Sequence, residues 1–303
     1  MFDPRYEAQV RLLIQCLPLL HDHPDFAVKG GTAINLFVQR MPRVSVDIDL
    51  AYLPLKPRDE ALAAISNGLL SLKTEMEQRI PGSAVREQRT GGRPVRLALS
   101  SPAANVKVEP NLIFRGAVYP PAEAELCAEA QQQFQAYVRI QALHVADLYG
   151  GKLCAALDRQ HPRDLYDVKL LLEGMGITPD IRRAFVVYLA GHNRPMNELL
   201  RPRLKDIGSL YNSQFVGMSR HDVALRDLVA VQEELPELLR KSLDGDERAF
   251  LISLKRGEPE WDRLGIGHIA QLPALQWKLQ NIQRMEKTKQ REALTKLKGT
   301  LSA

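Results

Sequence analysis

The first half of the chain combines two periods of hydrophobic positions. Between residues 6 and 20 the apolar side chains recur every three or four positions, at Val10, Leu13, Ile14, Leu17 and Leu20. This spacing predicts an amphipathic helix. A second helix is predicted over residues 58–79, and a shorter helical stretch is predicted to follow Thr32 and to end near Arg40.

Shorter segments with a period of two separate these helices. They predict strands over residues 26–28, 44–50 and 105–114, and a hairpin over residues 86–99 that turns at Gly91-Gly92. In residues 44–50 the apolar positions alternate with serine and aspartate, which predicts a strand with one buried face and one polar face.

Strand patterns nearly disappear after Gly116. Helical patterns replace them, over residues 145–160, 162–173, 179–190, 221–243 and 275–285. The chain is therefore predicted to be α+β, with a mixed-sheet domain over residues 1–130 and a mainly helical domain over residues 131–303. We also expect Trp261 and Trp277 to be interior anchors of the helical domain.

The composition is that of a globular protein. Hydrophobic residues make up 45% of the 303 residues and charged residues 25%. The sequence contains no run of about 18 apolar residues, so no membrane helix is predicted. Residues 1–5 lack the pattern of a secretory signal. The three cysteines, Cys16, Cys127 and Cys154, are scattered, which is typical of reduced thiols. We therefore expect a cytoplasmic protein that does not enter a membrane.

Positive charge is concentrated near the C-terminal end. Residues 276–303 contain seven Lys or Arg residues and two Glu residues, so this basic tail accounts for the whole formal net charge of +5. A basic segment on an otherwise neutral chain can bind the phosphates of a nucleic acid. It can equally be a solvated helix face.

The pair Asp47 and Asp49 is the first candidate for chemistry. Residues two apart on a strand point to the same face, so the two carboxylates lie side by side and need a compensating cation. Carboxylate oxygens on a rigid strand suit Mg²⁺, as one or two ions. Glu109, on the polar face of another alternating strand, could supply a third ligand. The alternative is an exposed polar strand face.

A glycine turn precedes this pair in the chain. Gly30-Gly31-Thr32 leads into a predicted helix, and glycines at a helix N-terminus let backbone N–H groups approach an anion. The alternative is a tight turn with Thr32 as the N-cap. A phosphate-binding turn followed by a carboxylate pair is the combination that chemistry on a complex of a nucleoside triphosphate (NTP) and Mg²⁺ requires.

These motifs resemble those of a known family. The run Lys29-Gly30-Gly31-Thr32-Ala33, followed by Arg43-Val44-Ser45-Val46-Asp47-Ile48-Asp49-Leu50, is similar to the opening motif of the AbiEii/AbiGii toxin nucleotidyltransferases. A second motif is similar as well: Lys152-Leu153, Asp158-Arg159 and Arg163-Asp164-Leu165-Tyr166-Asp167. The first motif is shared by the DNA-polymerase-β-like nucleotidyltransferases, and the second narrows the resemblance to this family.

The resemblance implies a fold and an activity. It implies a nucleotidyltransferase core with a mixed sheet, followed by a helical C-terminal domain, in the toxin of a bacterial toxin–antitoxin pair. The implied reaction transfers a nucleoside monophosphate (NMP) from an NTP to an RNA acceptor, the 3′ end of tRNA, by Mg²⁺-dependent in-line displacement of pyrophosphate. The implied partners are the NTP, the RNA and a cognate antitoxin that need not contact the toxin.

The resemblance also implies roles for residues of the first domain. Asp47 and Asp49 become catalytic metal ligands, with Glu109 as the third, and Asp49 or Glu109 could help to deprotonate the attacking hydroxyl. Glu109 is longer than the Asp common in the wider superfamily, which leaves a shifted metal geometry or a single-metal site open. The implied NTP-binding residues are Lys29, Gly30, Gly31, Thr32, Arg43 and Ser45.

In the helical domain the resemblance implies that Lys152 and Asp164 are catalytic, with Lys152 neutralising phosphate charge. Asp167 stays open between a role in the site and a structural role at the start of a helix. Two other functions stay open as well. One is an enzyme of the same superfamily that modifies a small hydroxylated molecule, such as an aminoglycoside, and the other is a non-catalytic regulatory protein on the same fold.

Overall fold

The computed structural model describes residues 2–302 and divides into two compact units. The sheet unit comprises Met1–Leu148 and Phe215–Asp222, and the helical unit comprises Tyr149–Gln214 and Val223–Ala303. The division thus falls later than the expected boundary at residue 130, because the chain after that residue still adds a strand to the sheet. The return of Phe215–Asp222 to the sheet unit has no counterpart in the sequence pattern.

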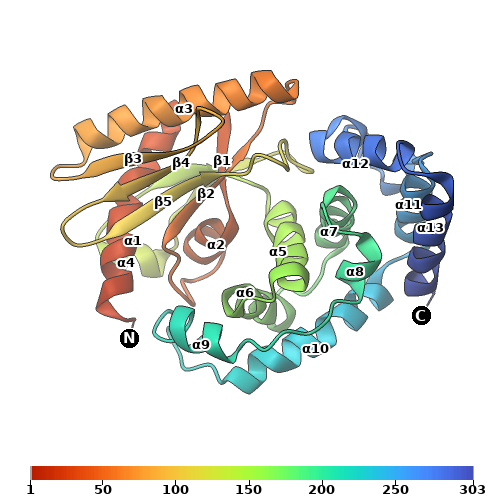
Figure 1. Cartoon of the computed structure of the whole chain (residues 1–303). Coiled ribbons are helices and arrows are strands. Elements are labelled where there is room, and N and C mark those ends of the chain that lie inside the picture. The colour runs from red at the N-terminus through yellow and green to blue at the C-terminus, as the bar shows by residue number, and fades with distance from the viewer. Residues whose placement is uncertain (1, 303) are drawn as a thin grey trace. The chain divides into compact units, whose positions relative to one another are not determined.

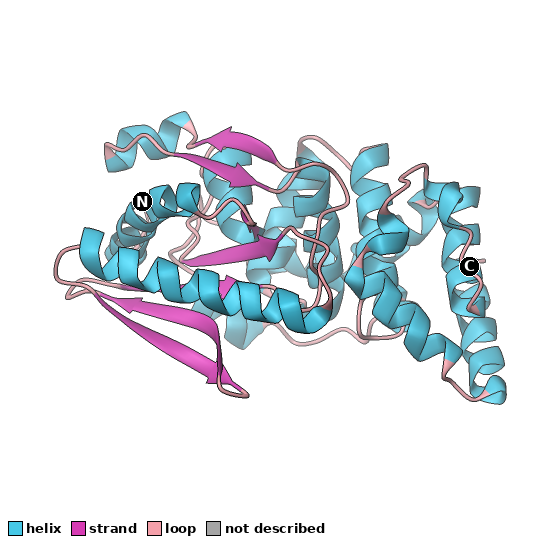
Figure 2. Cartoon of the chain, turned by 90° about the horizontal axis from the view of Figure 1, so that it is seen from above, coloured by secondary structure: helices cyan, strands magenta, loops and turns pink. Residues whose placement is uncertain are grey.

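The sheet unit is built on one mixed sheet of seven strands, drawn in magenta in Figure 2. Its strand order is β3-β4-β5-β2-β1-β7-β6. The strands are β1(Phe26–Lys29), β2(Asp47–Tyr52), β3(Ala84–Thr90), β4(Arg93–Ser100), β5(Asn105–Pro110), β6(Ala122–Glu125) and β7(Arg139–Ala142). β2 runs antiparallel to β1 and parallel to β5. The prediction of an α+β fold with a mixed sheet is confirmed.

β2 occupies the middle of this order, and its two faces differ. Ile48 and Leu50 are fully buried, whereas Asp47 and Asp49 on the other face are half-buried. The strand begins at Asp47 rather than at the predicted residue 44. The reason is a tertiary contact: the backbone N–H of Val44 donates to the carbonyl of Met218, and Arg43 forms an isolated bridge with Ser219.

Helices pack on the sheet where the hydrophobic period predicted them. The helices of this unit are α1(Pro4–Cys16), η1(Leu17–Asp22), α2(Gly30–Ala33), η2(Ile34–Val38), α3(Arg58–Arg79) and α4(Ala128–Phe134). Asp3 caps α1 by accepting from the backbone N–H of Arg5. α3 packs against β3 and β4, and α1 packs against β5. The predicted helices over residues 6–20 and 58–79 are therefore confirmed.

The expectation that strands nearly disappear after Gly116 is wrong for β6 and β7. β6 has the sequence Ala-Glu-Ala-Glu and buries no side chain fully, so it is held by its backbone pairing with β7. β7 carries a weak signal, because Ile140 and Ala142 alternate with polar residues and are buried. Four residues are too few for such an alternation to stand out along the chain.

The described part of the helical unit consists of helices and loops. α5(Val145–Arg159) crosses the division, and it is followed by α6(Pro162–Glu173), α7(Pro179–Gly191), α8(Met196–Leu200), α9(Gly208–Gln214), α10(Leu225–Ser242), α11(Gly245–Arg256), η3(Trp261–Leu264), η4(Ile269–Gln271), α12(Pro273–Gln283) and α13(Lys287–Leu301). α11 packs side by side with α13 and against α7 (Figure 1). The five predicted helices are confirmed, with shifts of a few residues at their ends. α11 and α13 were not predicted.

The two tryptophans differ in their surroundings. Trp261 is partly buried and its ring lies 5.8 Å from the ring of Phe250. Trp277 on α12 is 57% exposed, so the prediction of an interior anchor is wrong for this residue. Across residues 2–302, no helix has the length and apolar character needed to cross a membrane.

Candidate active site

A row of charged residues runs across four neighbouring strands of the sheet unit. Lys29 on β1 is the register partner of Asp49 on β2, and Asp49 is in turn the partner of Glu109 on β5. The guanidinium Nε of Arg96 on β4 lies 3.0 Å from Oε1 of Glu109. Register partners point to the same face of a sheet. The row therefore has one cation at each end and two carboxylates in its middle.

Asp47 adds a third carboxylate to the same face. It precedes Asp49 by two residues on β2 and is paired in register with Lys107. The opposite face of β2 and β5 is apolar, with Ile48 and Val108 fully buried. The hydrophobic alternation therefore fixes the direction of all three carboxylates, because turning either strand over would bury charge and expose the core.

The pKa of Glu109 reports how close these carboxylates are. Partial burial raises the pKa of Glu109, the guanidinium of Arg96 lowers it, and the charges of Asp47 and Asp49 raise it again, so that the net shift is upward. Carboxylates on one strand face repel one another, and the arrangement is stabilised by an added cation. No ion pair within residues 2–302 involves Asp47.

The donor set fits a hard divalent cation. Two half-buried carboxylates on one rigid strand are ligands of the kind that Mg²⁺ uses together with substrate phosphates. In the described residues no three His, Cys, Asp or Glu side chains converge into a complete metal-binding group. Asp47 and Asp49 would therefore hold the metal, while Glu109 is engaged by Arg96. A role of Glu109 as the third ligand stays a prediction.

The glycine turn lies directly against this carboxylate pair. Gly30 has a φ of 67°, in the left-handed region, and a Cβ at this position would lie 2.2 Å from Oδ2 of Asp49. A Cβ on Gly31 would lie 2.8 Å from a guanidinium nitrogen of Arg43 and 3.0 Å from Oγ of Ser45. Both glycines are thus required for the backbone to approach these side chains so closely.

Side chains around the turn fix it in place. Thr32 is fully buried, and its hydroxyl donates to the carbonyl of Asp47 at 2.5 Å. Arg43 is also buried and donates from Nη1 to the carbonyl of Val44 at 2.8 Å. The turn therefore brings together a guanidinium, the Ser45 hydroxyl and the Asp49 carboxylate. Contacts of these residues with an NTP stay predictions.

The glycine turn is itself the start of a helix: Gly30–Ala33 form α2 with Lys29 at the N-cap, so Thr32 is not the cap, and the chain continues into a helix of unusual type. η2 (Ile34–Val38) is a π-helix, in which the backbone N–H of Gln39 donates to the carbonyl of Ile34. Short π-helical segments are rare and occur frequently at functional sites. The sequence showed only that this stretch was helical, because nothing in its hydrophobic period distinguishes the two helix types.

A second cluster lies within the helical unit, between α5 and α6. Nζ of Lys152 lies 2.9 Å from Oδ1 of Asp164 and 3.0 Å from Oδ2 of Asp167. Arg159 also reaches Asp164, at 2.8 Å from its Oδ2. Lys152 is 7% exposed, Asp164 3% and Asp167 1%. The structure thus brings together the three residues that the second motif indicated.

Local sequence explains why these residues meet. Pro162 occupies the first turn of α6, and the His161 side chain caps the helix by accepting from the backbone N–H of Arg163. Asp164 and Asp167 then share one face of α6 because they are three residues apart. Arg159 was not among the predicted site residues, although it belongs to the same motif and lies two turns after Lys152 on α5.

The charges of this buried cluster satisfy one another. Burial alone would raise the pKa of Asp164, but the Lys152 ammonium and the Arg159 guanidinium more than offset this effect and hold the pKa well below its usual range. Asp164 is therefore ionised at neutral pH. The pair Asp47–Asp49 differs, because among residues 2–302 no cationic side chain forms an ion pair with Asp47.

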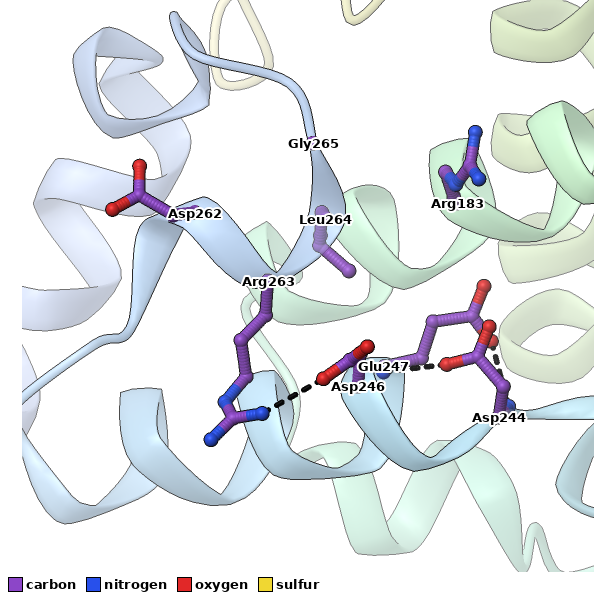
Figure 3. A pocket seen from close by; sticks show the side chains of 8 residues that line it. All are labelled: Arg183, Asp244, Asp246, Glu247, Asp262, Arg263, Leu264 and Gly265. Atoms are coloured by element: carbon purple, nitrogen blue, oxygen red, sulfur yellow. Dashed lines mark hydrogen bonds and ion pairs between the residues drawn. The ribbon is translucent and has the colours of Figure 1, made fainter.

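The helical unit also contains a hollow of about 340 Å³ between α7, α11 and η3 (Figure 3). Its polar lining is arranged in structural contacts. Arg263 pairs with Asp246 at 2.7 Å, and Asp244 and Glu247 form the capping box at the start of α11. None of the predicted site residues lines this hollow, and the carboxylates of Asp244, Asp246 and Glu247 are occupied by caps and ion pairs. It therefore adds no candidate chemistry.

A mixed sheet that carries a Gly-Gly turn against paired strand carboxylates is the arrangement that the resemblance to nucleotidyltransferases implies. The comparison with protein families agrees: the family described as nucleotidyl transferase AbiEii toxin, type IV toxin–antitoxin system, matches residues 11–281. Since this match spans most of the chain, the protein belongs to the AbiEii family. No curated protein matches the sequence.

A solved structure supports the fold assignment. MenT4, a nucleotidyltransferase toxin from Mycobacterium tuberculosis H37Rv, is similar over 97% of this chain and 95% of its own, with a TM-score of 0.60. The sequence identity is 17%. At this identity the likeness shows that the two chains share a fold, and the chemistry of this chain has to be argued from its own residues.

Proposed function

We propose that this protein transfers an NMP from an NTP to the 3′ end of tRNA and releases pyrophosphate, with Mg²⁺ as the metal. The observation that carries the proposal is the close approach of the glycine turn to Asp49, beside Asp47 on the same strand face. Family membership supports the nucleotidyl transfer. The RNA acceptor and the metal are inferred from the charges described below.

Asp47 and Asp49 are proposed to hold Mg²⁺. Bound there, the ion would supply positive charge that stabilises the triphosphate and the leaving pyrophosphate. Asp49 lies between its register partners Lys29 and Glu109, so strand pairing sets the position of its backbone before substrate arrives. Preorganised charge of this kind needs no reorganisation during the reaction.

The turn and its buried supports are proposed to bind the triphosphate. Gly30 and Gly31 keep the backbone free of side chains, so that its N–H groups can approach phosphate oxygens. The Arg43 guanidinium and the Ser45 hydroxyl, both buried beside Gly31, supply a positive charge and a hydrogen-bond donor. Lys29 adds a cation next to Asp49.

In the helical unit, Asp164 and Asp167 are proposed to keep the Lys152 ammonium charged and fixed. A buried lysine without a carboxylate tends to lose its proton, whereas Lys152 lies within 3.0 Å of both carboxylates. An ammonium held in this way can offset the negative charge of a phosphate. Asp164 and Asp167 thereby act as positioning residues for Lys152.

The basic tail supports RNA over a small acceptor. Six of its cations are exposed and, in the described residues, none of the six forms an ion pair; they are Arg284, Lys287, Lys289, Arg291, Lys296 and Lys298. Unpaired cations on one segment attract a polyanion. The seventh cation, Lys278, is not available to a polyanion in the same way, because its ammonium donates to the carbonyls of His192 and Arg194 at 2.7 Å and 3.0 Å.

Membership of a type IV toxin–antitoxin family implies a cognate antitoxin as a partner. We propose that this antitoxin acts without direct contact with the toxin. We also propose that the protein is cytoplasmic, where NTPs and tRNA are available.

The test is transfer of label from each of four α-labelled NTPs to purified total tRNA in the presence of Mg²⁺. Asp47→Ala is expected to lower the transfer at least about a hundredfold, the usual scale for loss of one charge-stabilising group. Asp59→Ala is the matched control, because Asp59 lies in the same unit with its side chain 88% exposed. Its transfer should equal that of the wild type.

Other outcomes assign other functions. Label that does not enter RNA, together with Asp47-dependent release of pyrophosphate in the presence of small hydroxylated acceptors, would show a small-molecule modifying enzyme. Equal transfer by wild type and Asp47→Ala would show that the carboxylate pair is not the active site. Omission of Mg²⁺ should abolish transfer, and undiminished transfer in a chelator would overturn the metal assignment.

A further inference from the structure

α12 carries an aromatic side chain, Trp277, that is largely exposed and does not contribute to the buried core. Trp277 is 57% exposed, although the helix buries Leu275 and Ile282 on its opposite side. An exposed tryptophan alone is common and carries no meaning. Its neighbours along the helix decide what it can bind.

Those neighbours form one polar stripe without negative charge. Gln280, Asn281 and Arg284 follow Trp277 at spacings of three, four and seven residues, so they share its face of the helix. All three are exposed, and within residues 2–302 no side-chain hydrogen bond or ion pair engages them. α12 contains no Asp or Glu at all. The stripe therefore offers a ring face, two amides and a guanidinium to a ligand.

α13 continues this positive character. Lys287, Arg291 and Lys298 lie four and seven residues apart and share one side of the helix. None of them is paired with an acid in the part of the chain that the structure describes. Two partly buried arginines of the helical unit are held differently: Arg182 binds Asp244 and Glu247, and Arg194 binds Asp158. The cations near α12 are thus available for a ligand, whereas these two arginines are occupied.

We propose that the stripe Trp277, Gln280, Asn281 and Arg284 is a binding surface for a single-stranded segment of the RNA acceptor. Indole rings stack on any nucleobase, and amides bond to base edges. The Arg284 guanidinium, with Lys287 and Arg291, binds the phosphates. The inference rests on the proposed RNA acceptor and adds the residues that hold it.

A protein partner fits the same surface less well. The hot spots of protein interfaces lie within larger apolar patches, and Trp277 is the only large exposed hydrophobic residue that the described part of α12 contributes. The absence of acidic residues over the whole of α12 favours a polyanion.

The first experiment measures the affinity of the full-length protein for a single-stranded RNA of about ten nucleotides, which is within the usual site size, and for bulk tRNA. Trp277→Ala should weaken binding about tenfold, since stacking on an aromatic ring is lost. Met175→Ala is the matched control, because Met175 is 50% exposed in the same unit. Its affinity should be that of the wild type, and NTP binding should be unchanged in both.

Salt dependence separates stacking from charge. Trp277→Ala should leave the slope of log affinity against log salt unchanged. The triple variant Arg284→Ala, Lys287→Ala, Arg291→Ala should lower that slope by about 2, from roughly 0.7 per phosphate contact with a single strand. Arg226→Ala, whose side chain is 90% exposed in the same unit, is the control for a lost surface charge.

Tryptophan fluorescence gives a direct signal of stacking. Trp261→Phe leaves Trp277 as the reporter, and Trp277→Phe leaves Trp261. RNA should quench the fluorescence of the first variant and not that of the second. The quenching measurement does not depend on nucleotidyl transfer activity.

The outcomes distinguish the surface from the proposed function. If wild type labels RNA but Trp277→Ala binds it equally well and Trp277 is not quenched, the surface is wrong and the proposed function stands. If wild type labels no RNA, the proposed function fails, and absence of quenching would overturn the surface too. If the antitoxin binds the wild type and this binding is lost in Trp277→Ala with RNA affinity unchanged, the stripe belongs to a protein interface, and the proposal of an antitoxin that acts without contact fails as well.

Discussion

The two compact units each contain a group of carboxylates and cations, and the groups differ in how their charges are satisfied. In the helical unit, Asp164 and Asp167 enclose Lys152, and all three are almost completely buried. In the sheet unit, Asp47 and Asp49 lie half-buried on one strand face. There the pKa of Glu109 is raised, first by burial and also by the repulsion of both aspartates.

This difference in charge balance indicates that the two groups of charged residues have different roles. A buried group whose charges balance stabilises one arrangement of α5 and α6 and keeps an ammonium in place. A group of like charges on an accessible face stores repulsion that an added cation relieves. Removing a member of the first group should therefore cost stability, and removing a member of the second should cost activity.

The largest effect is expected for Lys152→Met. This change leaves the carboxylates of Asp164 and Asp167 buried without their ammonium, which costs about 3–5 kcal/mol of unfolding free energy. Urea denaturation measures the loss, and Lys169→Met is the matched control, since Lys169 forms only a surface pair with Glu173 on the same helix. Adding Asp164→Asn and Asp167→Asn to Lys152→Met should restore much of the stability. A variant as stable as wild type would mean that the cluster does not hold α5 and α6 together.

Gly30→Ala should separate geometry from backbone strain. A Cβ at Gly30 meets Oδ2 of Asp49 at 2.2 Å, whereas a Cβ at Gly82 has open space, although both glycines have positive φ. Gly82→Ala should cost about 1 kcal/mol of stability through backbone strain, and Gly30→Ala should cost more because the clash with Asp49 adds to the same strain. Only Gly30→Ala should lower nucleotidyl transfer, by up to about a hundredfold, because it displaces Asp49. Equal activity of the two variants would show that the position of Asp49 does not matter.

The smallest effect is expected in how the unfolding free energy depends on pH under acidic conditions. The folded-state pKa of Asp164 lies below its usual value because Lys152 and Arg159 outweigh the effect of burial. Its contribution is therefore present above about pH 4, the value in the unfolded chain, and is lost as the pH falls toward the folded-state pKa. The difference in unfolding free energy between wild type and Asp164→Asn should shrink below pH 4. Asp180→Asn, in an exposed pair with Arg183, should show a small difference at any pH, and a constant difference for Asp164→Asn would contradict the argument.

Some features of the site could be predicted from the sequence because they depend on local geometry. The period of two placed Asp47 and Asp49 on one face and Ile48 on the other, and the structure agrees. The spacing of three placed Asp164 and Asp167 on one face of a helix. These relations follow from the pitch of a strand and a helix, which is the same in every protein.

Other features could not be predicted, because they depend on residues far apart in the chain. The neighbour of Asp49 is Glu109 only because β2 and β5 pair in parallel with one particular register. The strand begins at Asp47 rather than residue 44 because Met218 and Ser219 return to that part of the sheet unit. The sequence pattern contains no information on such pairings.

The basic tail also combines features that the sequence predicts with features that only tertiary contacts decide. Its charge was evident from the sequence, but Lys278 proved to be bound to two carbonyls, with burial first and the nearby Lys255 next lowering its pKa to about 8. Its neighbour Trp277, expected inside, is exposed. Which side of α12 faces the core depends on the helices against which it packs, α7 and α11.

The sequence by itself determined the family motifs, most of the helices and strands, and the faces on which the candidate residues lie, because each follows from neighbours along the chain. Only the tertiary structure decided that Gly30 touches Asp49, that Lys152 lies between two aspartates, and that Trp277 is open to solvent. The physical reason is that burial and charge pairing arise from contacts between distant segments, and those contacts form only when the core is packed.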